Sequence, residues 1–156
     1  MKRLIAIVIV LGMFLIAQNS FAQCDPKNMM IPFMTIRGNV LCPDGSIPTM
    51  VTLDWFKVDG VICADENINW TYPFSGNGTY DLQFWLDNSI DHTLQICVTT
   101  QCNIGGNTVN VQAGFSADGM TPGDCNAIAD YPLGISAMLA HIVTPVQLSS
   151  FTASAL

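Results

Sequence analysis

The sequence predicts an all-β protein: an antiparallel β-sandwich of six to seven strands that follows an N-terminal signal peptide. Three observations support this prediction. Apolar and polar residues alternate with period two along most of the chain, and clusters of Gly, Asn, Asp and Pro separate the alternating runs. The chain also has few charged residues, whereas solvated helix faces would need many.

Residues 1–22 have the three-part layout of a secretory signal peptide. Two cations precede an apolar run from residue 4 to 17, and Ser20 and Ala22 supply the small residues of a cleavage site. The run is shorter than the roughly 20 residues that a membrane-spanning helix needs. We therefore expect export, cleavage after Ala22 and a secreted, extracellular or cell-surface protein, with no membrane insertion after the signal is removed.

The charge of the mature chain limits its partners. After cleavage, three cations (Lys27, Arg37 and Lys57) remain against twelve acidic residues, so the net charge falls from −7 to about −9. Three cations cannot neutralise a run of phosphates, which excludes nucleic acid as a partner. An anionic membrane surface is disfavoured for the same reason.

The cysteines indicate disulfides. All six follow the cleavage site, and an even number in an exported chain favours pairing, although the sequence does not select the pairs. On one continuous strand, Cys97 and Cys102 would point to opposite faces about 17 Å apart, too far for one bridge. Either the strand breaks near Thr100, or each pairs elsewhere. The candidates are Cys24, Cys42, Cys63, Cys97, Cys102 and Cys125.

Residues 33–115 are expected to form the sandwich, and its first strands alternate clearly. In "FMTIRGNVLC", Met34, Ile36 and Val40 share a face, and "PDGSIP" supplies the turn that follows. "MVTLDWFKV" continues the pattern and ends at the hairpin signal Asp59-Gly60. A regular strand would place Val51, Leu53 and Trp55 on one face, and Thr52, Asp54 and Phe56 on the other.

The later strands follow the same rule. "NWTYPF" places Trp70, Tyr72 and Phe74 on one face, and Pro73 removes a backbone donor, so this strand should be short or at an edge. The strongest alternation is in "TYDLQFWL", and the pattern returns in "HTLQICVTT" and "TVNVQAGF". The inward residues are expected to be Tyr80, Leu82, Phe84, Leu86, Leu94, Ile96, Val98, Val109, Val111 and Ala113.

Other parts of the chain have weaker patterns. Residues 23–32 form an N-terminal extension, and residues 116–143 read as a loop-rich covering segment around the turn "DGMTPGD". Within that segment, the pattern of "PLGISAMLAHIV" fits either a short helix or another strand. Residues 144–156 are uncharged and partly apolar, which is unusual for a soluble terminus.

Two stretches resemble known families. "TIRGNVLCPDGSIPTMVTLDWF" resembles the first hairpin of carboxypeptidase-regulatory-like and transthyretin-like sandwiches, and "GNGTYDLQF" resembles a later strand of the same modules. "PVQLSSFTAS" resembles the joining segment of bacterial type IX secretion substrates. That likeness implies that residues 144–156 lead toward a missing domain, whereas pairing with an edge of this domain is the alternative.

Catalytic and metal-binding patterns are weak. The histidines are His92 and His141, and no Gly-x-Ser-x-Gly nucleophile elbow occurs. Twelve acidic residues always offer some carboxylate pair, and the Asp and Asn clusters near Asp87 and Asp118 lack the EF-hand spacing. We expect neither an enzyme nor a cofactor, and no metal site.

Aromatic residues offer a candidate ligand site. If Leu82 and Phe84 face inward, Trp85 must face outward beside Asp81 and Gln83, an arrangement common in carbohydrate-binding modules. The row that contains Trp70 and Tyr72 is a second candidate. The alternative is that this row belongs to the core and that Trp85 is capped by the tail or by a neighbouring domain. The sequence thus predicts a non-catalytic structural or adhesive module that contacts other domains of the same or a neighbouring surface protein; the alternative is a carbohydrate-binding accessory module with a glycan ligand.

Overall fold

The computed structural model describes residue 24, residues 33–87 and residues 89–146. The described residues form two five-stranded sheets. Their strands are β1 (Phe33–Leu41), β2 (Met50–Val58), β3 (Val61–Ile62), β4 (Ile68–Thr71), β5 (Thr79–Trp85), β6 (His92–Ile104), β7 (Asn107–Ala113), β8 (Ala129–Tyr131), β9 (Ala137–Leu139) and β10 (Ile142–Val143). A short 3₁₀ helix, η1 (Asp65–Asn67), precedes β4. The predicted all-β class is confirmed.

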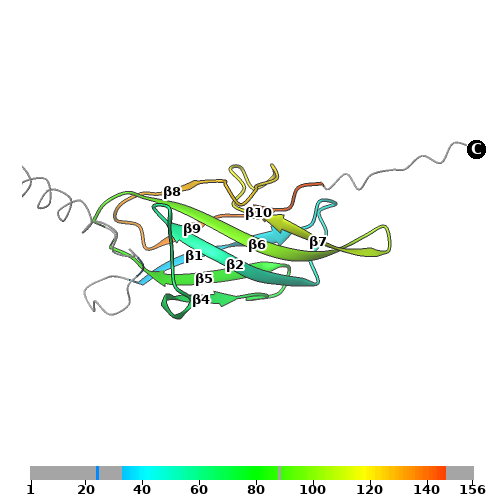
Figure 1. Ribbon diagram of the computed structural model, residues 1–156, viewed down its shortest axis with the longest axis horizontal. Coiled ribbons are helices and arrows are strands. Elements are labelled where there is room, and N and C mark those ends of the chain that lie inside the picture. The colour runs from blue at the N-terminus through cyan, green and yellow to red at the C-terminus, as the bar shows by residue number, and fades with distance from the viewer. Residues whose placement is uncertain (1–23, 25–32, 88, 147–156) are drawn as a thin grey trace, which may run out of the picture.

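The two sheets pack face to face (Figure 1). The first has the order β10-β1-β5-β4, with β9 also pairing with β1, and the second has the order β3-β2-β6-β7, with β8 also pairing with β6. The long pairs β1–β5, β4–β5, β2–β6 and β6–β7 are all antiparallel, as predicted. β9 and β10 instead run parallel to β1, which sequence alternation does not reveal.

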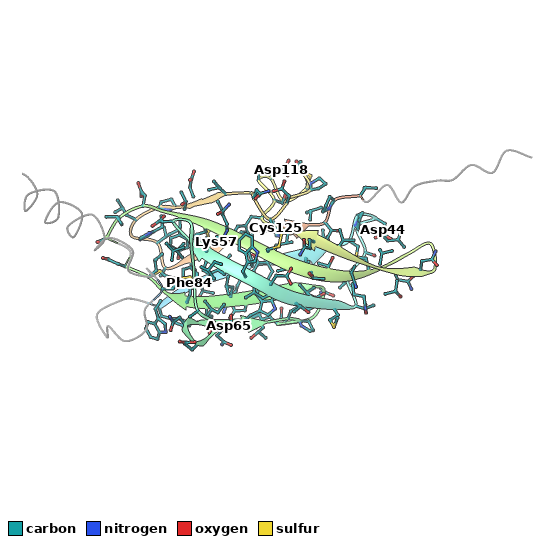
Figure 2. All side chains as sticks on the ribbon, in the orientation of Figure 1. Asp44, Lys57, Asp65, Phe84, Asp118 and Cys125 are labelled. Carbon is teal, nitrogen blue, oxygen red and sulfur yellow. A yellow bond between two sulfur atoms is a disulfide. The ribbon has the colours of Figure 1, made fainter. Side chains whose placement is uncertain are left out.

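The core lies between the sheets and contains most of the side chains that alternation placed inward; Val109 on β7 is an exception and is only half-buried. On β5, Tyr80, Leu82, Phe84 and the following Leu86 are fully buried. The rings of Phe56 on β2 and Phe84 on β5 lie 4.8 Å apart, so they join the two layers directly. Figure 2 shows Phe84 on its strand within the sandwich.

A β-bulge corrects one prediction. The β2–β6 register passes from Leu53 opposite Val98 to Trp55 opposite Cys97, which leaves Asp54 as the extra residue. The extra residue reverses the parity of the remaining strand. Phe56 is therefore fully buried and Trp55 lies on the outer face, the opposite of what strict alternation predicts.

The covering segment is richer in strands than expected, and this raises the strand count above six to seven. Residues 116–143 contain β8, β9 and β10, each only two or three residues long. Runs this short carry too few residues to display a period. In Figure 2, Asp118 marks the part of this segment that projects from the upper side of the sandwich.

Three disulfides use all six candidate cysteines: Cys24–Cys63, Cys42–Cys102 and Cys97–Cys125. β6 is continuous through Cys97 and Cys102, which pair elsewhere, so the second of the two alternatives is correct. Cys42 follows β1 of the first sheet, so its bridge to β6 joins the two sheets. The Cys97–Cys125 bridge fastens the covering segment to the second sheet.

The turns predicted between strands are present. The amide of Cys42 donates to the Ser46 carbonyl across the "PDGSIP" turn, and Asp59 and Gly60 both have positive φ between β2 and β3. β4 is short and lies at a sheet edge, as Pro73 predicts. The predicted signal peptide, the N-terminal extension apart from Cys24, and residues 147–156 lie outside the described residues.

Candidate functional site

The outer face of the first sheet carries three of the predicted ligand residues. Asp81, Gln83 and Trp85 occupy alternate positions of β5 and point away from the buried set, as predicted. Trp85 and Gln83 are half-buried, whereas Asp81 is only 2% exposed. Asp81 is therefore covered by its neighbours rather than open to solvent.

A hydrogen-bonded row links side chains of three strands on this face. Nε of Arg37 on β1 donates to Oδ1 of Asp81 at 2.5 Å, and Nε2 of Gln83 donates to Oδ2 at 2.6 Å. Nδ2 of Asn69 on β4 donates to Oε1 of Gln83 at 3.1 Å. Antiparallel register creates this row, because Arg37 lies opposite Asp81 and Asn69 opposite Gln83. The bonds fix the orientation of both amides.

Aromatic side chains flank the polar row at both ends. Phe33 lies directly opposite Trp85 in the β1–β5 ladder, and the two rings meet edge to face with centroids 5.1 Å apart. At the other end, Cζ of Arg37 lies 4.9 Å from the ring centroid of Phe74, a cation–π contact. Phe33 and Phe74 are 42% and 46% exposed, so both rings present apolar surface to solvent.

Sequence reasoning missed Arg37, Asn69, Phe33 and Phe74 as neighbours of Trp85. Each belongs to another strand or to the turn before β5, and alternation within one strand does not say which strands pair. The sequence shows the alternation of apolar and polar residues along β1, but it does not show the register in which β1 pairs with β5.

Trp70 and Tyr72, the second predicted row, lie elsewhere. Both pack against the hydrophobic core, and the ring of Trp70 stacks on Tyr80 with centroids 5.1 Å apart. The Tyr72 hydroxyl donates to the Pro48 carbonyl at 3.0 Å, and burial raises its pKa. The structure therefore separates Trp70 and Tyr72 from Trp85 and turns Phe74 to the outer face.

The bulge creates a different aromatic feature on the second sheet. Trp55 lies on its outer face, with Nζ of Lys57 4.1 Å from the ring centroid. Nearby, Oδ2 of Asp54 accepts hydrogen bonds from Thr99 at 2.7 Å and Gln112 at 3.2 Å. The lysine ammonium makes a cation–π contact with the indole, as Arg37 does with Phe74.

Both histidines make structural hydrogen bonds. Nδ1 of His92 lies 2.8 Å from Oδ2 of Asp59, and Nε2 lies 2.5 Å from the carbonyl of Asp87. Burial raises the pKa of Asp59, but hydrogen bonds from Thr93 and His92 outweigh it and hold that pKa below its usual value. Nδ1 of His141 accepts from the Asn39 amide at 3.2 Å.

The carboxylates of the two acidic turns, at Asp87 and Asp118, accept hydrogen bonds from backbone amides of the same turns. The Asp118 carboxylate accepts from the Thr121 hydroxyl and from the amides of Thr121 and Met120, which hold its pKa well below the usual range. Oδ1 of Asp87 likewise accepts from the Ser89 amide. Within residues 24, 33–87 and 89–146, no three His, Cys, Asp or Glu side chains are placed to hold a metal ion.

A cavity of about 500 Å³ lies beside the Asp118 turn. Residues 115–119, residues 127–130 and residues 138–141 line it, so it occupies the side of the sandwich between β8 and β9. The cavity does not include the hydrogen-bonded row or any of the predicted ligand residues.

No protein-family model, curated protein or solved structure matches the chain. The resemblance to carboxypeptidase-regulatory-like and transthyretin-like modules therefore stays a prediction. Three disulfides indicate an oxidising environment. The described part of the chain contains no helix long and apolar enough to span a membrane.

Proposed function

We propose that the protein is a non-catalytic extracellular module, structural or adhesive, of a larger secreted or cell-surface bacterial protein. The observation that carries the proposal is the set of three disulfides, two of which fasten the two sheets and the covering segment together. Such bridges keep a small domain folded where no cytoplasmic reductant acts and no chaperone is present. The two-sheet architecture is also compatible with a carboxypeptidase-regulatory-like or transthyretin-like module.

The test uses cells that produce the protein. Antibodies against the oxidised chain are expected to label intact cells or to detect the chain in the culture medium. Deletion of residues 33–146 is expected to reduce attachment of the cells to a surface. Export of the remaining chain serves as the control. Labelling that requires permeabilised cells would contradict the extracellular location, and unchanged attachment would contradict the adhesive role.

A second candidate function is a carbohydrate-binding accessory module. It is favoured by the position of Trp85 on an outer sheet face beside Phe33 and the oriented amide of Gln83. Affinity electrophoresis in gels that contain β-1,4-glucan, β-1,3-glucan, xylan or mannan tests it. Retardation that Trp85→Ala abolishes is expected. Trp55→Ala, which removes an indole from the opposite sheet, is the matched control and should leave retardation unchanged.

A further inference from the structure

The outer face of the first sheet carries two separate aromatic positions with a polar row between them. We propose that this face binds a neutral, linear oligosaccharide that spans both positions, with one sugar ring on the Phe33–Trp85 pair and another on Phe74. The proposal rests on the carbohydrate-binding function above. It adds a second subsite, assigns Arg37, Asn69, Phe33 and Phe74 to the site, and defines the charge of the ligand.

The first subsite is the Phe33–Trp85 pair. The two rings meet edge to face, which fixes their orientation, and Phe33 remains 42% exposed. The negative face of an aromatic ring attracts the weakly positive C–H groups on the apolar face of a pyranose. A rigid pair loses little conformational freedom when a sugar binds.

The second subsite is Phe74 with Arg37. The guanidinium lies over the ring of Phe74, and the Arg37 side chain is 55% exposed although its Nε is bonded to Asp81. Nε supplies one of five guanidinium donors, so the Nη groups are available to hydroxyl oxygens. Arg37 thus adds hydrogen-bond donors beside an exposed ring.

The row between the subsites matches the chemistry of hydroxyl groups. Gln83 uses one N–H towards Asp81 and its carbonyl towards Asn69, which leaves its second N–H and the carbonyl of Asn69 for a ligand. The face therefore presents a fixed N–H donor on β5 next to a fixed carbonyl acceptor on β4. A sugar hydroxyl both donates and accepts, so a ligand with successive hydroxyls can satisfy this row.

Charge favours a neutral ligand. Arg37 and Asp81 form an ion pair at 2.5 Å, which cancels the charge at the centre of the face. The chain as a whole carries −7, so an acidic glycan would be repelled at long range. Arg37 lies four residue steps beyond Phe33 on β1, a span of about 13 Å that requires an oligosaccharide rather than a single sugar.

Titration calorimetry with the oxidised full chain tests the proposal. The probes are hexasaccharides and disaccharides of β-1,4-glucan, β-1,3-glucan, β-1,4-xylan and β-1,4-mannan, with hexagalacturonate as the acidic probe. We expect one neutral hexasaccharide to bind at least tenfold more tightly than its disaccharide and than hexagalacturonate. Trp85→Ala should weaken the hexasaccharide at least tenfold. Phe74→Ala should weaken it at least threefold without affecting the disaccharide.

The outcomes separate this proposal from the function on which it rests. If a neutral sugar binds through Trp85 but Phe74→Ala and chain length have no effect, the two-subsite site is wrong and carbohydrate binding stands. If none of the four hexasaccharides binds the folded wild-type chain, both are wrong. Tighter binding of hexagalacturonate overturns the assignment of a neutral ligand. Trp55→Ala and thermal unfolding of each variant control for loss of fold.

Discussion

The hydroxyl of Tyr80 on β5 donates a 2.5 Å hydrogen bond to the carbonyl of Ala140, which lies between β9 and β10. The bond crosses beneath β1 at Gly38, the position opposite Tyr80 in the β1–β5 ladder. Burial raises the pKa of Tyr80 far above its usual value, so the hydroxyl stays a donor. This contact adds to the backbone pairing of the two very short strands β9 and β10 with β1.

Tyr80→Phe is expected to destabilise the fold by about 1–2 kcal/mol, because it leaves the Ala140 carbonyl without its buried donor. Urea unfolding at neutral pH measures the loss. Tyr131→Phe is the matched control, since that residue is also fully buried and its hydroxyl donates to Sδ of Met34, a weak acceptor. Equal losses in the two variants would show that the Ala140 contact has no special weight.

Gly38→Ala is expected to cost at least about 3 kcal/mol, because the added Cβ would lie 1.8 Å from the carbonyl oxygen of Ala140. The backbone of β9 and β10 would have to move away from β1. Gly134→Ala is the control: it adds strain at a positive φ but meets open space, so about 1–2 kcal/mol is expected. Thermal unfolding compares them, and a smaller loss at Gly38 would contradict this packing.

Deletion of Asp54 is expected to preserve the fold. Removing the bulge residue leaves Val51, Leu53 and Phe56 facing inward in regular alternation, so the core is unchanged. Deletion of Thr52 is the control, because it shifts part of the buried set to the wrong face. Circular dichroism and disulfide mapping distinguish the two. Loss of folding on deletion of Asp54 would show that the bulge itself is required.

Removal of the Cys42–Cys102 bridge by a double Ser substitution is expected to cost about 4 kcal/mol on a chain-entropy basis. Its sequence separation of 60 exceeds the 28 of Cys97–Cys125, so removal of the second bridge should cost somewhat less. Guanidinium unfolding of the two double variants gives the order. The reverse order would indicate that contacts around the covering segment, rather than chain entropy, dominate.

Acid is expected to weaken the fold partly through Asp118. A carboxyl whose pKa is lowered on folding stabilises the native state above its unfolded pKa of about 3.8, and this contribution is lost as pH falls through the lower folded value. Urea midpoints at pH 7 and pH 3 should therefore differ less in Asp118→Asn than in the wild type. Asp130→Asn controls for the loss of one negative charge, and an unchanged difference in Asp118→Asn contradicts the prediction.

The sequence alone determined the class of fold, most of the core and the outward position of Trp85. These features depend on side-chain alternation within a single strand, which is a local property. Alternation placed Tyr80, Leu82 and Phe84 in the core, and the structure agrees. Alternation misplaced Trp55 and Phe56 on β2, because the extra residue Asp54 exchanges the faces of the residues that follow it. No residue type in this stretch identifies a bulge.

Tertiary structure alone decided which strands are neighbours, and therefore the composition of the candidate site. Arg37 meets Asp81, and Phe33 meets Trp85, only because β1 pairs with β5 in one register. The partners Cys42 and Cys102 were likewise brought together by the packing of the two sheets. Such contacts join residues far apart in the chain, and their free energy depends on the whole folded arrangement rather than on any short stretch of sequence.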